Sequence, residues 1–188
     1  MPAPLRVSQD ELIAAIRRIA EHDGIDAVTM SSVASAVGMR TPSLYKRAAH
    51  RHDLLRLAAD DAARELVAGL AGIPEPDGDP GEVLARLARA LRAFAATAPR
   101  ISALLFAAPS EEAAPSPSAS EPLLRLLLAA VEAASPGDPL PAARTLTAWI
   151  FGFSTMEQAG AFRLGGDVDD AFEFGLDAVL RAIGVRGS

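Results

Sequence analysis

One short stretch of the chain gathers cationic and hydroxyl side chains that suit contact with a phosphate backbone. Lys and Arg attract phosphate charge, and Ser, Thr and Tyr hydroxyls donate hydrogen bonds to phosphate oxygens. A helix lying in the major groove reads base edges from its N-terminal half, which favours Arg40, Ser43 and Lys46, although Lys46 suits a phosphate contact equally. The full set of candidate DNA-binding residues is Thr29, Arg40, Thr41, Pro42, Ser43, Tyr45, Lys46 and Arg51.

Two short helices joined by a turn are predicted to position these side chains. Thr29 is a favourable N-cap for the first helix, in which Ala34 is small enough for a second helix to cross. Gly38 accepts the positive φ angle that a tight turn requires. Thr41 is predicted to cap the second helix, and Pro42 suits its first turn, where a missing N–H costs nothing. This pattern is typical of a helix-turn-helix.

The stretch resembles the DNA-binding domain of the tetracycline-repressor (TetR) family of bacterial transcriptional regulators. The matching residues fall within residues 8–57 and are Thr29, Val33–Ala34, Gly38–Met39, Leu44–Tyr45, Arg51 and Asp53–Leu54–Leu55. The resemblance implies a DNA-binding regulator in which Thr41 and Tyr45 contact phosphate. Ala48 departs from the pattern, because the family usually has an aromatic residue there. The smaller side chain implies less packing under the second helix of the helix-turn-helix.

The rest of the chain shows helical periodicity and no alternating strand pattern. A capping box of Ser8 and Glu11 opens a first helix that ends at Gly24. Further helices are predicted over residues 51–70, 83–94, 101–107, 123–134, 141–164 and 168–183. The Pro-rich segment 74–81 and the Pro- and Ser-rich run 108–122 are predicted to be loops, the second of them mobile.

Charge is distributed unevenly along the chain. The 188 residues carry a net charge of −6, which by itself argues against a nucleic-acid partner. Residues 1–56 carry eight Lys or Arg against six Asp or Glu, giving +2, whereas residues 57–188 carry ten against eighteen, giving −8. Only the N-terminal part is therefore predicted to bind DNA.

The sequence lacks the residues that several classes of protein require. The absence of cysteine excludes disulfides and thiolate metal sites, and the pair His50 and His52 has no third ligand at helical spacing. We find no catalytic set and no phosphate-binding glycine loop, so an enzyme has little support and neither a metal nor a cofactor is expected. The sequence also lacks a membrane-spanning apolar run and a signal-peptide pattern, which favours a cytoplasmic protein with no membrane partner.

The C-terminal part is predicted to bind an effector and to form a homodimer. Ala148–Trp149, Gly152 and residues 172–176 resemble the Trp-His-Gly type of TetR-family C-terminal domain, although Phe151 stands where that motif has His. Aromatic and Met side chains at helical spacing line either a core or a pocket, and the candidates for an effector pocket are Phe94, Phe106, Trp149, Phe153 and Met156. The candidates for a dimer interface, with burial inside one subunit as the alternative, are Gly152, Gly160, Phe172, Leu176, Val179 and Ile183.

Together the patterns predict an all-α fold with an N-terminal three-helix helix-turn-helix domain at residues 1–52 and a C-terminal helical effector-binding and dimerisation domain at residues 53–188. The leading hypothesis is a homodimeric repressor that binds a palindromic, double-stranded operator and is released by a small, mostly apolar molecule. The alternative is a DNA-binding protein whose C-terminal part only dimerises or recruits a protein partner. A cavity of ligand size would distinguish the two hypotheses.

Overall fold

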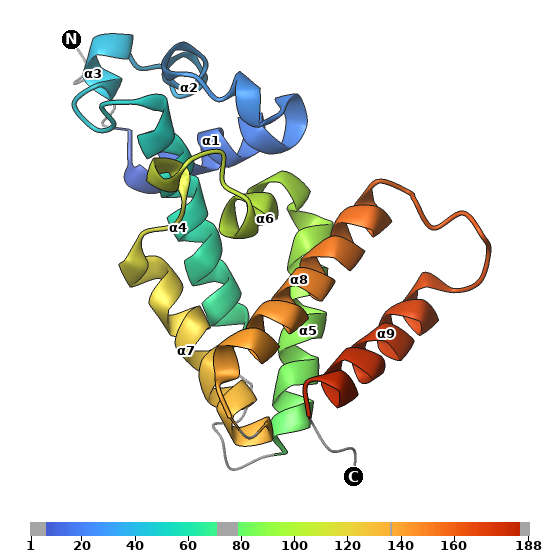
Figure 1. Ribbon diagram of the computed structural model, residues 1–188. Coiled ribbons are helices and arrows are strands. Elements are labelled where there is room, and N and C mark those ends of the chain that lie inside the picture. Colours follow the sequence, from blue (N-terminus) through green and yellow to red (C-terminus); the bar gives the residue numbers. More distant parts are fainter. Residues whose placement is uncertain (1–6, 71–78, 136, 185–188) are drawn as a thin grey trace. The chain divides into compact units, whose positions relative to one another are not determined.

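The computed structural model describes residues 7–70, 79–135 and 137–184, and every regular element of this described part is helical, as predicted (Figure 1). The chain divides into two compact units. Unit 1 comprises residues 1–64 and 100–119, and unit 2 comprises residues 65–99 and 120–188. The predicted domain boundary after residue 52 stays a prediction. Within the described ranges, no helix combines the length and the apolar composition that a membrane crossing requires.

Helix α1, Gln9–Asp23, forms where the first helix is predicted. The Oγ of Ser8 accepts from the N–H of Glu11 at 3.0 Å, and the carboxylate of Glu11 accepts from the N–H of Ser8 at 2.7 Å, which completes the capping box. Gly24 ends the helix with a φ of 102°, a value that favours glycine. A short 3-10 helix, η1 (Ile25–Ala27), follows.

Helix α2, Met30–Ala36, is the first helix of the predicted helix-turn-helix. Thr29 caps it as predicted, because its Oγ1 accepts from the N–H of Ser32 at 3.0 Å. Gly38 has a φ of 65° and closes the helix in a Schellman motif, in which its own N–H and that of Met39 donate to carbonyls of the last turn. Local side-chain and glycine signals thus account for both ends of α2.

Helix α3, Thr41–Leu44, is the recognition helix of the motif. The prediction that Thr41 caps α3 is wrong, because Thr41 is already the first helical residue and the N-cap is Arg40, whose side chain makes no capping hydrogen bond. Pro42 lies in the first turn as predicted. Leu44 is completely buried and anchors this short helix in unit 1.

Helix α4, Arg51–Gly69, begins in unit 1 and continues into unit 2. It buries one apolar side, formed by Leu54, Leu55, Ala58, Ala62 and Leu66, whereas Leu57 is half-buried. Unit 1 also contains helix α6 (Pro99–Phe106) and the 3-10 helix η2 (Glu111–Ala113). No feature of the sequence indicated that these later segments join the helix-turn-helix in one unit.

The prediction of a mobile loop over residues 108–122 is wrong. Helix α7, Pro117–Ala134, begins inside this run. Ala113 is buried, and the carboxylate of Asp60 on α4 accepts from the N–H of Ser116 at 2.6 Å and from its Oγ at 3.0 Å. Contacts with a distant part of the chain therefore order a segment whose composition alone favours disorder.

In unit 2, helix α5 (Pro80–Thr97), helix α8 (Pro139–Gln158) and helix α9 (Val168–Ala182) pack against one another. Figure 1 shows α8 and α9 running in opposite directions and joined by a long loop. The largest fully buried side chains of this unit are Leu84, Leu87, Leu146, Phe172 and Leu176. They form an apolar core shared by the three helices.

Two predicted boundaries in unit 2 differ from the structure. The helix predicted over residues 141–164 is too long, because Gly160, with a φ of 61°, closes α8 in a second Schellman motif. The loop predicted over residues 74–81 extends too far, because Pro80 and Gly81 belong to the first turn of α5. Residues 74–78 of that loop lie outside the described residues.

Candidate nucleic-acid interface

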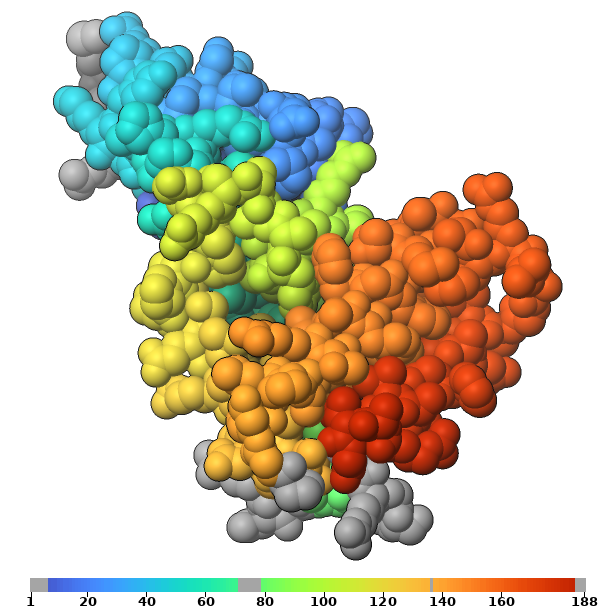
Figure 2. All heavy atoms as spheres, viewed as in Figure 1, coloured from blue at the N-terminus to red at the C-terminus, as the bar shows by residue number. Residues whose placement is uncertain are grey.

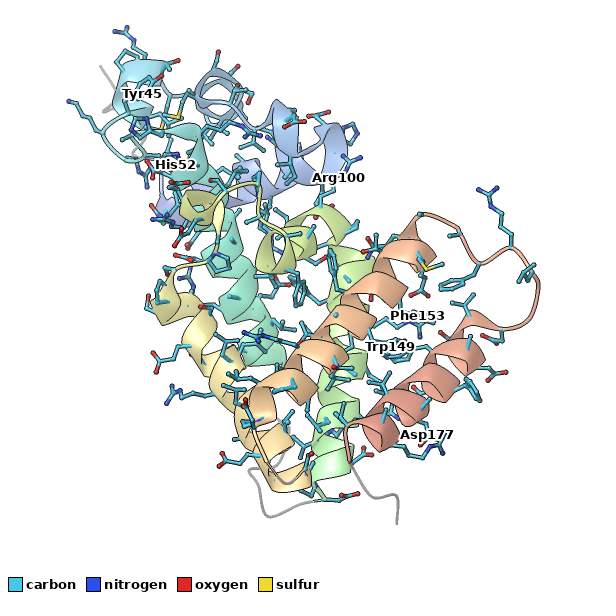
Figure 3. All side chains as sticks on the ribbon, viewed as in Figure 1. Tyr45, His52, Arg100, Trp149, Phe153 and Asp177 are labelled. Carbon is cyan, nitrogen blue, oxygen red and sulfur yellow. The ribbon has the colours of Figure 1, made fainter. Side chains whose placement is uncertain are left out.

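Helix α3 and its flanks expose a row of polar side chains. Tyr45 is 53% exposed although it directly follows the completely buried Leu44. Figure 3 shows Tyr45 at the α3 end of unit 1. The other exposed candidates are Thr29, Arg40, Pro42, Ser43 and Lys46, whereas Thr41 is half-buried. Leu44 therefore anchors the helix while the side chains around it remain accessible to a partner.

This surface is cationic because acidic residues are absent from it and because two of its cations form no ion pair in the described ranges. Residues 27–52 contain no Asp or Glu, although the chain as a whole is acidic. Among the ion pairs found in the described ranges, none involves Arg40 or Lys46. Two exposed cations thus face solvent on a segment without acidic side chains, an arrangement that attracts a polyanion.

The side chain of Arg51 donates hydrogen bonds to backbone carbonyls of unit 1. Its Nε donates to the carbonyl of Val28 at 2.8 Å, and its Nη2 donates to the carbonyl of Ile25 at 2.6 Å. Nη2 also lies 3.3 Å from the carboxylate of Asp26. These bonds attach the start of α4 to the segment that precedes α2. The geometry favours a positioning role for Arg51 over the predicted DNA contact.

Arg47 has a similar role, which the sequence patterns did not reveal. Its Nη1 donates to the carbonyl of Val7 at 2.8 Å, and its Nη2 donates to the Oε1 of Gln9 at 3.0 Å. Arg47 therefore holds the chain after α3 against the beginning of α1. The neighbouring Ala48, where the TetR pattern has an aromatic residue, is buried.

A hydrogen bond between His50 and Asp53 stabilises the start of α4. The N–H of His50 donates to the carboxylate of Asp53 at 2.8 Å, and this bond is the main reason that the pKa of Asp53 is lowered. The rings of His50 and His52 lie 5.0 Å apart. In the described part of the chain, no group of three or more potential metal ligands includes this pair. The two His residues thus flank a helix start.

The predicted effector residues Trp149 and Phe153 belong to an aromatic cluster in unit 2. Their ring centroids are 5.6 Å apart, and each ring lies 5.2 Å from that of Phe172 on α9. Phe162, in the loop after α8, lies 4.8 Å from Phe153. Figure 3 shows both labelled side chains between α8 and α9. The cluster packs these two helices together.

The other predicted effector residues differ from one another in exposure and position. Phe94 on α5 is buried, Met156 on α8 is exposed, and Phe106 is half-buried in unit 1. The five residues therefore fall in different environments. Their role in binding an effector stays a prediction.

Arg92 of α5 is the ionic centre of unit 2 and was not singled out from the sequence. Its Nε and Nη2 donate to both carboxylate oxygens of Glu157 on α8 at 2.9 and 2.5 Å, and Nη2 also lies 2.7 Å from the carboxylate of Asp169 on α9. Its guanidinium carbon lies 4.6 Å from the ring centre of Phe172. The hydrogen bonds to Glu157 raise the pKa of Arg92, despite the opposing effect of burial. Arg92 therefore joins three helices.

An open groove of about 500 Å³ lies between α5 and α9. Its apolar wall includes Phe174, which is 76% exposed. Its charged lining residues are Asp79, Glu82, Arg89, Glu173, Asp177 and Arg181. Arg89 donates to both carboxylate oxygens of Glu173 at 2.9 and 2.8 Å and so joins the two helices across the groove. Figure 3 labels Asp177 on α9. A groove with this lining is not the apolar chamber that the predicted effector implies.

The predicted dimer residues divide between core and surface. Phe172, Leu176 and Ile183 are buried within the chain itself, so the alternative of burial inside one subunit holds for their side chains. Val179 is half-buried, and Gly160 lies in the turn that ends α8. At Gly152 a Cβ atom would meet nothing within 4 Å, so no other part of the described chain crosses closely there.

The exposed apolar side chains of this region were not singled out as interface residues. They are Leu140, Met156, Phe162, Leu164 and Phe174, on α8, on α9 and in the loop that joins these helices. Figure 2 shows this loop standing away from the two helices. Helical periodicity alone did not separate the exposed Phe174 from the buried Phe172 two residues earlier.

Comparisons with protein families identify both halves of the chain. Residues 12–58 match the family described as bacterial regulatory proteins, tetR family. Residues 84–179 match the family described as tetracyclin repressor-like, C-terminal domain. No curated protein matches significantly.

Three solved structures illustrate the similarity of the fold. A possible TetR family transcriptional regulator from Streptomyces coelicolor is 26% identical, with a TM-score of 0.75, and the alignment covers 94% of this chain and 98% of that one. BioQ with its natural double-stranded DNA operator is 23% identical, with a TM-score of 0.68 and coverage of 96% and 100%. A TetR variant from Acinetobacter baumannii in complex with minocycline is 24% identical, with a TM-score of 0.69 and coverage of 97% and 100%.

Proposed function

Because the chain belongs to the TetR family of transcriptional regulators, we propose that it is a homodimeric repressor that binds a palindromic operator and is released by a small, mostly apolar molecule. Proteins of this family regulate transcription and are not enzymes. The observation that carries the proposal is the exposed, acid-free surface around α3, where Arg40 and Lys46 have no ion-pair partner in the described part. A regulator of this kind works where the operator DNA is, in the cytoplasm.

Operator binding is supported by the similar BioQ structure, which was solved with its own double-stranded operator. In this chain the corresponding contacts are assigned to the accessible side chains around α3. Tyr45 and Thr41 bind phosphate, and Arg40, Ser43 and Lys46 lie nearest the base edges. Arg47 and Arg51 hold the helix-turn-helix in shape, because their guanidinium groups bond to other parts of unit 1.

Dimer formation is assigned to the exposed apolar side chains of α8 and α9. Phe174 and Met156 are exposed large apolar side chains, and Gly152 leaves space for a second helix. Exposed apolar surface of this kind is typical of a protein interface. Two copies of the α8–α9 pair would form a four-helix bundle and so place two recognition helices in one assembly.

Effector binding is supported by the minocycline complex of the similar TetR variant. In this chain the aromatic cluster of Trp149 and Phe153 offers apolar surface between α8 and α9. The alternative is that the C-terminal part only dimerises or recruits a protein partner.

Selection of bound DNA from a random pool tests the proposal. We expect enrichment of a two-fold symmetric sequence whose half-sites are about one helical turn or a multiple of it apart. A folded protein that enriches no sequence would contradict operator binding. Screening apolar and aromatic compounds for release of the selected DNA then separates the two hypotheses, because the alternative predicts that no compound competes.

A further inference from the structure

The chain passes between the two units at three places. It crosses inside α4 after residue 64, at the joint of α5 and α6 after residue 99, and inside α7 after residue 119. Any movement of unit 2 therefore reaches unit 1 along three covalent connections. The first connection is the continuous helix α4, and the other two enter the segment 100–119.

The second crossing is anchored by Glu21, near the C-terminal end of α1. One carboxylate oxygen of Glu21 accepts from the N–H of Ile101 at 2.7 Å, and the other accepts from the N–H of Arg100 at 3.2 Å. These N–H groups belong to the first turn of α6 and have no partner within that helix. The carboxylate also suits the positive end of the helix dipole. Glu21 thus caps a helix that is distant in sequence.

Arg100 completes this anchor in the opposite direction. Its Nη1 donates to the carbonyl of Glu21 at 3.1 Å and lies 3.4 Å from the carbonyl of Ala20. These carbonyls lie in the last turn of α1, where a cation is favourable. Figure 3 labels Arg100 in this region of unit 1. Each helix end therefore provides the polar groups that the other end lacks.

The third crossing is anchored in the same way by α4. The carboxylate of Asp60 accepts from the N–H and the Oγ of Ser116, directly before the first residue of α7. The neighbouring Asp61 pairs with Arg17 of α1 at 2.6 Å. Arg17 lies one turn before Glu21, so α1 is joined to α4 and to α6 through adjacent turns of one helix.

We propose that Glu21 and Asp60 are positioning residues that couple unit 2 to the recognition helix, by making α6 and the start of α7 move with α1 and α4. The coupling then runs along all three covalent connections and not along α4 alone. This inference rests on the proposed function as a DNA-binding regulator. The anchors themselves are not assigned to DNA contact.

The test uses the full-length protein and the operator selected from a random pool. Coupling is reciprocal, so operator binding at α3 must alter unit 2 if unit 2 is to alter operator binding. We expect operator DNA to change amide hydrogen exchange in α5 and the fluorescence of Trp149 in the wild-type protein. In the double variant Glu21→Ala, Asp60→Ala, both changes should be lost. Its operator affinity should remain within about threefold of wild type, below the roughly fivefold at which allosteric coupling usually begins.

Two further variants distinguish coupling from simple loss of stability. Glu21→Gln retains one acceptor oxygen and should keep part of the operator-induced change in amide hydrogen exchange of α5. Asp10→Ala removes an exposed carboxylate at the other end of α1 and should keep all of it. If the double variant does not fold, the Glu21→Gln variant provides the comparison, and its coupling must still fall below that of Asp10→Ala.

Three results would overturn the proposal. The first is a wild-type change in α5 that persists in the double variant. The second is a wild-type protein that binds operator without any change in unit 2. The third is a folded double variant that no longer binds operator, because the anchors would then serve the DNA-binding surface itself. Failure of the wild-type protein to select any DNA would instead contradict the proposed function.

Discussion

Gly175 on α9 lies directly against the indole of Trp149 on α8. A Cβ atom at position 175 would come within 2.5 Å of the Cζ2 atom of Trp149, a distance that real Cβ contacts do not reach. The backbone of α9 therefore approaches the ring as closely as only glycine permits. The close helix crossing of this region is at Gly175, and not at Gly152 or Gly160, where an added Cβ would meet nothing within 4 Å.

The first prediction concerns this contact. Gly175→Ala should displace the indole or separate α8 from α9, and should lower the free energy of unfolding by about 1–3 kcal/mol, as overpacking usually does. Thermal unfolding followed by Trp149 fluorescence measures the effect. Gly69→Ala on α4 is the matched control, because its Cβ would meet nothing within 4 Å, and it should be neutral or stabilising. Equal stability of the two variants would contradict the close contact.

The second prediction concerns the DNA-binding surface. Tyr45→Phe removes only a hydroxyl and should weaken binding to all sequences by roughly 1.5 kcal/mol, the usual value for a hydrogen bond to a charged group. Lys46→Ala should reduce the salt dependence of binding by about one unit of slope if Lys46 neutralises a phosphate, or relax sequence choice if it reads a base. Arg125→Ala in unit 2, where Arg125 is exposed, is the control and should change neither. Unchanged binding by both α3 variants would place the interface elsewhere.

The third prediction separates positioning from contact at Arg51. Arg51→Ala removes the side-chain donor to the carbonyls of Ile25 and Val28, of which that of Ile25 keeps the N–H of Val28. The variant should lose about 1–3 kcal/mol of stability and should bind operator less well without any change in the salt slope. Urea unfolding and binding at several salt concentrations provide the two measurements. A stable Arg51→Ala protein with a lower salt slope would instead support the DNA contact that the sequence predicts for Arg51.

The fourth prediction is a pH dependence at the groove of unit 2. The hydrogen bonds from Arg89 are the main reason that the pKa of Glu173 is lowered from its ordinary value of 4.5. A carboxyl group whose pKa is lower in the folded state stabilises the fold above its ordinary pKa and loses that contribution as the pH falls through the folded value. Thermal unfolding of Arg89→Gln should therefore lie below wild type at pH 7, and the difference should shrink toward pH 3. A difference that stays constant across this range would mean that the pair contributes nothing ionic.

The fifth prediction concerns dimer formation. Phe174→Asp replaces an exposed side chain on α9 and should give folded monomers by light scattering, whereas Phe172→Asp places a charge in the core and should unfold unit 2. Circular dichroism separates these outcomes. Folded dimers of Phe174→Asp would locate the interface on another face.

Local signals made the first helices predictable. The capping box of Ser8 and Glu11, the cap at Thr29 and the positive φ at Gly38 all depend on residues within a few positions of one another. The ordering of residues 108–122 was not predictable, because it depends on Asp60, which lies 56 positions before Ser116. Composition describes only what a segment does alone.

The site was predictable as a surface and less so residue by residue. Exposure at Tyr45 and Lys46 agrees with the helix-turn-helix pattern. Arg47 and Arg51 carry the same charge as Lys46. Their N–H groups, however, donate to backbone carbonyls elsewhere in unit 1. Periodicity likewise identifies a helix face without showing which of its residues the chain covers, as the buried Phe172 and the exposed Phe174 illustrate.

The three-helix junction at Arg92 limits which chemistry can rearrange unit 2. A guanidinium remains protonated at every physiological pH, so no proton can leave the junction to release Glu157 or Asp169. Separation of α5, α8 and α9 therefore means that these carboxylates pass into water or that another anion takes their place. An acidic compound carries such an anion, whereas a neutral apolar compound has only the aromatic side of Arg92 to act on, at Phe153 and Phe172.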